Sequence, residues 1–472
     1  MSTDALSTRA RRLNGLPLPA AGPRPLAKRV LTSPWTWVTI AAVIICALIL
    51  IELYRDWTAP QVVEPPPGVQ MDPITVDGAT PGMIWMSAGY AFWTLLFWIL
   101  VFLIVDRFRP QRPLVWFYAL GWGSCMAVWI SRYANTWVGQ HMGVVGFGDP
   151  ATATRVAVFV APFIEEFAKA TVLFWLAILV RQRLVSKLTM VCLGGLSAAG
   201  FAFTENVQYY WHLIWEATHR IDVGNPQEVV LQLVWLRGVV TAFGHPLFTI
   251  MTATGLAIAL RTRSKVVRVL APLAGFLLAA GLHMLFNSQA SLQSNDGQLM
   301  MYLLIAVPMV LSVTIFVVTQ VFQQGRLIRS RLTDYVRVGL LVEADPVVFA
   351  KLRLRLRAWV VSLSRGWRCW LATLRLQNAM TELAYLRDAE TKGLVDEIAS
   401  ARAQELLGQI GRLRSVALAD PRGEKINLPK LQFPWRNRQS AGSYTDWPPP
   451  GGGAGPTTRY SAVDPTWAPP PG

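Results

Sequence analysis

The sequence predicts an all-α polytopic membrane protein with about eight transmembrane helices, a cytoplasmic helical tail and a disordered C-terminus. Three observations support this fold class. The 472 residues are 53% hydrophobic and only 15% charged, whereas charged residues make up about a quarter of an ordinary soluble protein. The apolar residues gather into runs long enough to cross a bilayer. The basic residues concentrate in alternate loops between those runs, as the topology of membrane proteins requires.

Apolar runs of about 17 to 25 residues mark the predicted transmembrane helices. They begin near Trp35, Ile84, Leu114, Val156, Leu188, Val234, Val266 and Leu299. The segment before Trp35 is basic, and no small-residue cleavage site follows the first run, so we expect a retained membrane anchor. The sequence therefore divides into a cytoplasmic basic N-terminus (1–34), a transmembrane core (35–322), a cytoplasmic basic helical segment (323–427) and a disordered Pro/Gly-rich tail (428–472).

Lys and Arg are distributed unequally between the two sides of the predicted bilayer. The N-terminus and the loops after the second, fourth and sixth runs hold sixteen basic residues, and the other four loops hold four. The positive-inside rule then places both termini in the cytoplasm. The net charge of +16 is explained by this topology, so we expect no nucleic-acid partner. The four cysteines show no paired spacing, which argues against a disulfide framework and a thiolate metal site.

The basic segment after the last run has two distinct parts. Residues 351–376 interleave arginines with leucines and tryptophans, a pattern that fits an anionic lipid surface, a cytoplasmic partner, a short strand or an oligomer contact. Residues 378–414 have helical composition with Gly393 as a possible turn, which predicts a helical hairpin.

Ionisable residues inside the apolar runs are the candidate functional residues, because each one is costly in hydrocarbon unless it is paired or hydrated. The fourth run places Glu165, Glu166 and Lys169 near the middle of the bilayer. Helical geometry directs Lys169 between the two carboxylates, one turn deeper. A self-neutralising structural ion pair is one interpretation of Lys169, but it accounts for only one of the two carboxylates.

The fifth to seventh runs carry further polar groups. Glu205 and Asn206 lie in the outer half of the fifth run, where a structural cap is the plainer interpretation. His245 lies near mid-depth in the sixth run beside Pro246, which breaks the helix and frees a backbone carbonyl. In the seventh run, His283 and Asn287 are four residues apart and share a helix face near the outer surface, where they serve either a site or packing between helices.

The shared depth of these residues favours a functional cluster over independent structural roles. Three further histidines, His141, His212 and His219, fall in predicted outer loops or at a helix end, and we expect them to face solvent. In chain order, the polar motifs are EExxK (Glu165, Glu166, Lys169), FxxxEN (Phe201, Glu205, Asn206), an intramembrane histidine (His245) and HxxxN (His283, Asn287). Together they resemble the motifs of the PrsW family of intramembrane proteases.

This resemblance covers roughly residues 85–322 and implies hydrolysis of a peptide bond in or near the membrane-spanning part of a membrane protein. An anti-sigma factor is the family's known kind of substrate, and the bacterial plasma membrane is the implied location. The distantly similar CAAX-prenyl endoproteases have EExxxR as their first motif, and Lys169 at the shorter spacing favours PrsW.

Peptide hydrolysis requires a base for water and donors for the oxyanion. We expect Glu165 or Glu166 to be the base and His245 the second catalytic group, with His283 and Asn287 as oxyanion donors or water-orienting groups. Glu205 then holds a histidine in one tautomer, supported by Lys169 and Asn206.

The same residues also form a plausible zinc site, with Glu165, Glu166, His245 and His283 as ligands. The absence of a compact metal motif such as HExxH favours the metal-independent version slightly. Two other functions stay open: a proton- or cation-coupled transporter that uses the buried ionisable groups, and a catalytically silent membrane scaffold.

Overall fold

The computed structural model describes most of the chain from residue 26 to residue 425. The described residues are 26–63, 72, 74–108, 113–141, 154–179, 186–219, 223–290, 299–300, 302–393 and 397–425. They all belong to one compact unit of the chain, residues 1–426. The N-terminal 25 residues and the tail predicted to be disordered (428–472) lie outside the described residues.

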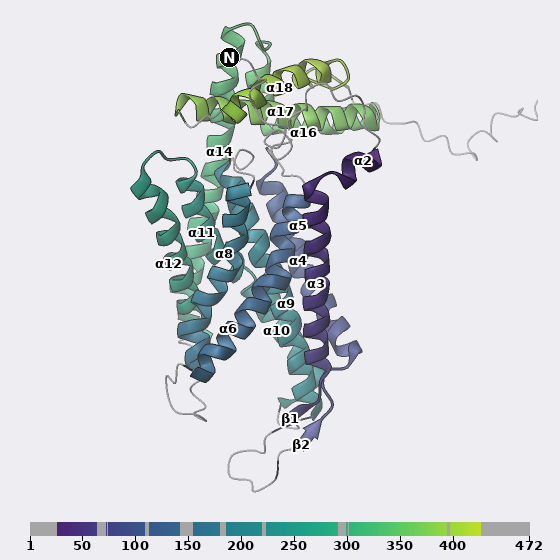
Figure 1. Cartoon of the computed structure of the whole chain (residues 1–472), viewed down its shortest axis with the longest axis vertical. Helices are drawn as coiled ribbons and strands as arrows, with labels where there is room; N and C mark the ends of the chain where they lie inside the picture. Colours follow the sequence, from purple (N-terminus) through teal and green to yellow (C-terminus); the bar gives the residue numbers. More distant parts are fainter. Residues whose placement is uncertain are drawn as a thin grey trace, which may run out of the picture. The chain divides into compact units, whose positions relative to one another are not determined.

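Within the described part of the chain, seven helices are long and apolar enough to cross a membrane. They span Pro34–Thr58, Pro81–Val105, Pro113–His141, Lys187–His219, Pro226–Ala259, Lys265–Ser288 and Tyr302–Arg337. The all-α, multi-pass membrane fold predicted from the apolar runs is therefore confirmed. Figure 1 shows these helices side by side over most of their length.

The fourth predicted run also forms a helix, although its composition sets it apart from the other seven. It consists of η3 (Val156–Val160) and α8 (Ala161–Leu179). Three ionisable residues, Glu165, Glu166 and Lys169, make this helix too polar to count among the apolar spans. More than half of the α8 residues are buried, and Glu165, Glu166 and Lys169 are among them. These three polar side chains are therefore enclosed by protein.

Two helices form the centre of the bundle. Helix α9 (Lys187–His219) packs against α4 (Pro81–Val105) and α11 (Gly244–Ala259), and α11 packs against α12 (Lys265–Ala290). Glycines allow these helices to approach closely. A Cβ atom added at Gly200 of α9 would lie 2.3 Å from the carbonyl oxygen of Leu120, and one at Gly255 of α11 would lie 2.2 Å from that of Ala271. A larger residue at either position would push the helices apart.

The remaining membrane helices surround this centre. They are α3 (Pro34–Thr58), α5 (Pro113–Gly121), η2 (Trp122–Ala127), α6 (Val128–His141), α10 (Pro226–Trp235), η6 (Leu236–Val240), η7 (Tyr302–Ala306) and α14 (Val307–Arg337). Short α2 (Leu26–Leu31) precedes α3, and a two-stranded antiparallel ribbon, β1 (Gln61–Val63) with β2 (Ile74–Val76), follows it.

The C-terminal module consists of α15 (Asp345–Ala350), α16 (Leu352–Ser364), α17 (Trp367–Thr391) and α18 (Glu397–Arg414). Its Leu/Arg-rich start is helix α16, so the short-strand interpretation of this segment is wrong. Helices α17 and α18 pack against each other, as expected for the predicted helical hairpin, and Gly393 has a φ of +61° two residues after α17. The first of these helices begins at Trp367, earlier than the predicted residue 378. The module has its own apolar core, which includes Phe108 from the end of α4 and Ile328 from α14.

Candidate active site

Helix α8 contributes three ionisable side chains to the interior of the bundle. The Nζ atom of Lys169 lies 3.2 Å from Glu165 Oε2 and 2.9 Å from Glu166 Oε1. The side chain of Lys169 is fully buried, and its ammonium group also lies 4.0 Å from the ring centroid of Phe201. The positions i+3 and i+4 on one helix produce this arrangement, as the sequence spacing predicts.

The two glutamates differ in their surroundings. Glu166 is completely buried and accepts a 2.6 Å hydrogen bond from the hydroxyl of Thr249 on α11. Its other oxygen, Oε1, lies 3.2 Å from Nδ1 of His283 on α12. Glu165, by contrast, lines a cavity of about 830 Å³. Glu166 therefore connects α8 to α11 and α12, whereas Glu165 is the glutamate that a bound molecule can contact.

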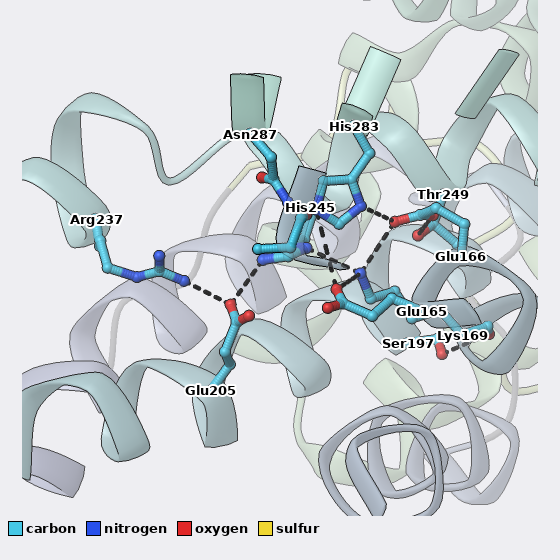
Figure 2. A network of polar contacts seen from close by, with 11 residues as sticks. Glu165, Glu166, Lys169, Ser197, Glu205, Arg237, His245, Thr249, His283 and Asn287 are labelled. Atoms are coloured by element: carbon cyan, nitrogen blue, oxygen red, sulfur yellow. Dashed lines mark hydrogen bonds and ion pairs between the residues drawn. The ribbon is translucent and has the colours of Figure 1, made fainter. Parts of the chain in front are cut away.

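His245 lies between a cation and a carboxylate. Its Nδ1 atom is 2.9 Å from Lys169 Nζ, and its Nε2 atom is 2.8 Å from Glu205 Oε2 (Figure 2). Because an ammonium group only donates hydrogen bonds, Nδ1 must accept, and the ring proton of a neutral His245 lies on Nε2. Glu205 thus selects the tautomer of His245, the role expected for a carboxylate behind a functional histidine.

Glu205 is itself held by an arginine inside the sixth span. Arg237 Nη2 donates a 2.5 Å hydrogen bond to Glu205 Oε2, and Arg237 Nε donates one of 2.9 Å to Asn206 Oδ1. The guanidinium carbon lies 3.9 Å from the ring centroid of Tyr209. Figure 2 shows the resulting series of contacts from Arg237 through Glu205 and His245 to Lys169. The planar fork of arginine fits this two-sided arrangement.

A break in the sixth span positions His245. The π-helical η6 ends at Val240, residues 241–243 are not regular helix, and α11 begins at Gly244. Pro246 has no N–H group for the carbonyl of Ala242, and the indole of Trp98 on α4 donates to that carbonyl at 2.9 Å. Two other side chains donate to carbonyls of the break: Thr94 to Gly238 at 2.9 Å and Tyr302 to Val240 at 3.2 Å.

His283 completes the cluster from α12. Its ring stacks on Phe248 with a centroid distance of 4.9 Å and an interplanar angle of 17°. With Nδ1 near Glu166, the Nε2 atom faces Glu165 Oε2 at 3.9 Å. Asn287, one turn further along, lines the same cavity and donates to the carbonyl of Ala157 at 2.9 Å. His283 thus has one nitrogen held by Glu166 and one directed toward the cavity side of the cluster.

Three of these groups can hold a metal ion. One ligand atom each from Glu165, His245 and His283 lies within 4.8 Å of the other two. Two histidines and one glutamate form a zinc ligand set that leaves a position for water. The contact between His283 and Glu166 is the kind of second carboxylate contact that orients a metal-binding histidine. The residues present therefore fit a zinc ion, although Lys169 occupies the Nδ1 side of His245.

The structure brings the predicted site residues together from four helices. Glu165, Glu166 and Lys169 come from α8, Glu205 and Asn206 from α9, His245 from α11, and His283 and Asn287 from α12. The other histidines, His141, His212 and His219, are exposed, as predicted.

Sequence reasoning missed Arg237, Thr249 and Trp98. The sequence does mark Arg237, because an arginine within an apolar run is itself a candidate functional residue. It does not mark Thr249 or Trp98, since their contacts depend on which helices are neighbours.

Comparison with known proteins identifies the membrane core. Residues 110–313 match the family model described as PrsW family intramembrane metalloprotease. The matched segment is less than half of the chain and contains every predicted site residue. The resemblance inferred from the four motifs is therefore confirmed for this segment. No curated protein and no solved structure matched the chain significantly.

Proposed function

Because residues 110–313 match the PrsW family of intramembrane metalloproteases, we propose that this core hydrolyses a peptide bond in or near the membrane-spanning part of a membrane protein. The observation that supports this most is the meeting of Glu165, His245 and His283 at one cavity. Cavities with a few convergent polar groups are the usual sites of catalysis. The family match alone supports a peptidase, and the residue roles that follow are our proposal.

Glu165 is proposed as the base that takes a proton from the attacking water. It lines the cavity, whereas Glu166 is enclosed by Lys169, Thr249 and His283. A base must reach the proton that it abstracts, which favours Glu165 over Glu166. His283 and Asn287, on the cavity wall, are proposed to orient the water or donate to the developing oxyanion.

The zinc-dependent alternative, which agrees with the family description, places the ion at Glu165, His245 and His283, and Glu165 is then a ligand and not the base. A bound zinc ion supplies Lewis acidity and makes water nucleophilic at neutral pH. Glu166 and Glu205 then orient the two histidines through the ring nitrogens that they contact. Lys169 contacts two of the three ligands, so the ammonium group and a metal ion compete for them.

The substrate proposed is a single-pass membrane protein such as an anti-sigma factor or a similar regulator. The family resemblance supports this proposal and the bacterial plasma membrane as the location, and the unequal distribution of Lys and Arg supports the placement of both termini in the cytoplasm. Polar side chains on the cavity wall, among them Asn206, Asn287 and Thr241, provide hydrogen-bonding partners for the backbone of an unwound segment.

Comparative membrane proteomics tests the proposed function. Cells that carry wild-type protein are compared with cells that carry Glu165→Gln, and a single-pass protein should accumulate in the variant as its cleaved form disappears. Cleavage of that protein by the purified enzyme should fall about 100-fold or more, the loss typical of a removed general base. Glu216→Gln, on α9 and outside the cavity lining, is the matched control and should cleave normally. Undiminished cleavage by Glu165→Gln would refute the assignment.

Metal content tests the zinc part separately. The purified wild type should contain about one zinc ion per chain, and His283→Ala should contain far less. Chelation should abolish cleavage, and added zinc should restore it. Full cleavage by zinc-free protein would instead support hydrolysis by the glutamate without a metal.

One observation favours a second function. The ionisable groups from Arg237 to His283 are connected by successive contacts, as in a proton pathway. Proton flux in liposomes that is abolished by Glu165→Gln, with no cleavage of any candidate protein, would favour a transporter.

A further inference from the structure

Helix α16 of the C-terminal module carries an exposed apolar stripe. Leu356, Val360 and Leu363 are 41%, 53% and 54% exposed, and their spacing of four and three residues places them on one helix face. Trp367, the first residue of α17, is 61% exposed. The exposed apolar stretches on the membrane-spanning helices are comparable, and lipid covers those.

A neighbouring face of α16 ties the module to the end of a membrane helix. Arg355 is 1% exposed, and its Nη2 atom donates a 2.7 Å hydrogen bond to the carbonyl of Phe108, three residues after the end of α4. Its Nη1 atom donates one of the same length to the hydroxyl of Thr381 on α17. In Figure 1, α16 runs crosswise to the membrane helices beyond their upper ends. These contacts hold the stripe beside the membrane boundary.

Basic side chains flank the stripe. Arg353, Arg357 and Arg368 are exposed, as is Arg365, whose guanidinium also pairs with Glu424. The end of the bundle to which α16 is tied is also its basic end, with Arg107 after α4 and Arg261 after α11. At the same end, α2 exposes Val30, Leu31 and Lys28 directly before the first span. Apolar side chains with adjoining arginines at this depth match the boundary between acyl chains and anionic headgroups.

We propose that Leu356, Val360, Leu363 and Trp367 insert into the boundary of an anionic phospholipid bilayer, and that the flanking arginines bind its headgroups. The stripe supplies the apolar contact, and each basic residue at an anionic surface strengthens binding about fivefold. A second copy of the chain is a less suitable partner for the stripe than the bilayer. Pairing two stripes would bring two sets of arginines together, and their like charges repel. The lipid contact is independent of the proposed protease activity.

Fluorescence quenching by lipid tests this contact in the full-length protein. A bimane dye is attached at Leu363→Cys in a Cys46→Ala, Cys369→Ser background, because those two native cysteines are partly exposed. The protein is placed in nanodiscs of phosphatidylcholine, with or without phosphatidylglycerol, that contain a nitroxide-labelled lipid. The control is Val338→Cys, which is 66% exposed at the end of α14, about 20 Å beyond the apolar run.

The dye at position 363 should be quenched severalfold more strongly than the dye at 338 when phosphatidylglycerol is present. Replacing Arg353 and Arg368 by Gln should reduce the difference, as should phosphatidylcholine alone. These positions are exposed, so thermal unfolding should be unchanged. Equal quenching at 363 and 338 would overturn the proposal. If Leu363→Cys chains instead form disulfide-linked pairs and lipid does not quench the dye, the stripe contacts a second copy of the chain. That result would also overturn the proposal.

Discussion

The indole Nε1 of Trp98 donates a 2.9 Å hydrogen bond to the carbonyl oxygen of Ala242, four residues before Pro246. This contact resolves a difficulty that the proline creates. In a membrane helix, a carbonyl without a partner is costly, since no water is present to replace the missing N–H group. Trp98 on α4 provides the donor, so the chain can break before α11 and still place His245 against Glu205. The helix break and the position of His245 therefore depend on each other.

Trp98→Phe should loosen this break while it preserves an aromatic side chain. The orphaned carbonyl of Ala242 should cost about 1–3 kcal/mol of stability, and cleavage should weaken because His245 is less well held. Thermal unfolding in detergent and cleavage of the identified substrate measure both effects. Trp93→Phe on the same helix is the control, because Trp93 is 69% exposed. Equal behaviour of the two variants would show that the contact with Ala242 does not support the break.

The sequence predicted the membrane fold, and it singled out the polar residues that the structure brings together, because both leave local patterns. Each apolar run predicts one transmembrane helix without reference to the others. The depth of Glu165, His245 and His283 in the membrane follows from their positions along those runs. The different surroundings of Glu165 and Glu166 were not predictable, since the two are adjacent and only the neighbours of α8 distinguish them.

The C-terminal module also has a feature that could not be predicted from the sequence, because it depends on contacts between helices. The alternation of Leu and Arg from Leu352 to Arg357 suits a strand by its period of two. The structure forms helix α16 there, because a helix buries Arg355, Ala358 and Val361 together on one face. That face is stabilised by Phe108, which is about 250 residues away in the chain, so no local pattern reports it.

Lys169→Met should increase the response of the protein to zinc. The ammonium group contacts Glu165 and His245, two of the proposed metal ligands, so a metal ion must compete with it. The variant should be several kcal/mol less stable without metal, because two buried carboxylates lose their cation. Added zinc should then raise its Tm by more than it raises that of the wild type.

The control for the zinc response is Lys187→Met, at the opposite end of the bundle from the proposed ligand set. This variant should respond to zinc as the wild type does. A zinc response in Lys169→Met that is no larger than that of the wild type would show that the ammonium group and the metal do not share ligands. Lys169→Arg, which keeps the charge, should respond no more strongly than the wild type.

Arg237 is expected to act on catalysis through Glu205 and His245. Arg237→Gln removes the charge that holds Glu205, and kcat should fall about 10-fold or more, as found for partners that orient a catalytic histidine. KM should change much less, because the proposed role is to position His245. Arg237→Lys should be intermediate, since a lysine lacks the fork that contacts both Glu205 and Asn206. Steady-state kinetics on the identified substrate separate the two parameters.

The matched control for Arg237 is Arg132→Gln. Arg132 pairs with Asp56 outside the cavity, so its loss should leave kcat unchanged. A rise in KM at constant kcat in Arg237→Gln would instead mean that Arg237 binds the substrate directly.

Asp388 should attach the C-terminal module to the membrane core. It accepts hydrogen bonds from Arg261 after α11 at 2.9 Å and from Arg331 on α14 at 3.1 Å. Lys392 contributes a third bond at 2.6 Å. Burial opposes ionisation of the Asp388 carboxyl, but the bond from Lys392 and the charges around it outweigh burial and hold its pKa below the ordinary value. Asp388→Asn should therefore cost about 2 kcal/mol at pH 7 and make the module easier to proteolyse.

The effect of Asp388→Asn should depend on pH in a defined direction. A carboxyl whose pKa is lower in the folded state stabilises the fold above its unfolded pKa, near 4, and loses this contribution as the pH falls through the folded value. The difference in Tm between wild type and variant should thus be largest near pH 7 and shrink below about pH 4. Glu390→Gln, which alters an exposed ion pair with Arg387 on the same helix, should change Tm little at either pH. If the difference in Tm does not change with pH, the variant loses packing or neutral hydrogen bonds and not ion pairs. The ion pairs of Asp388 would then not be what holds the module.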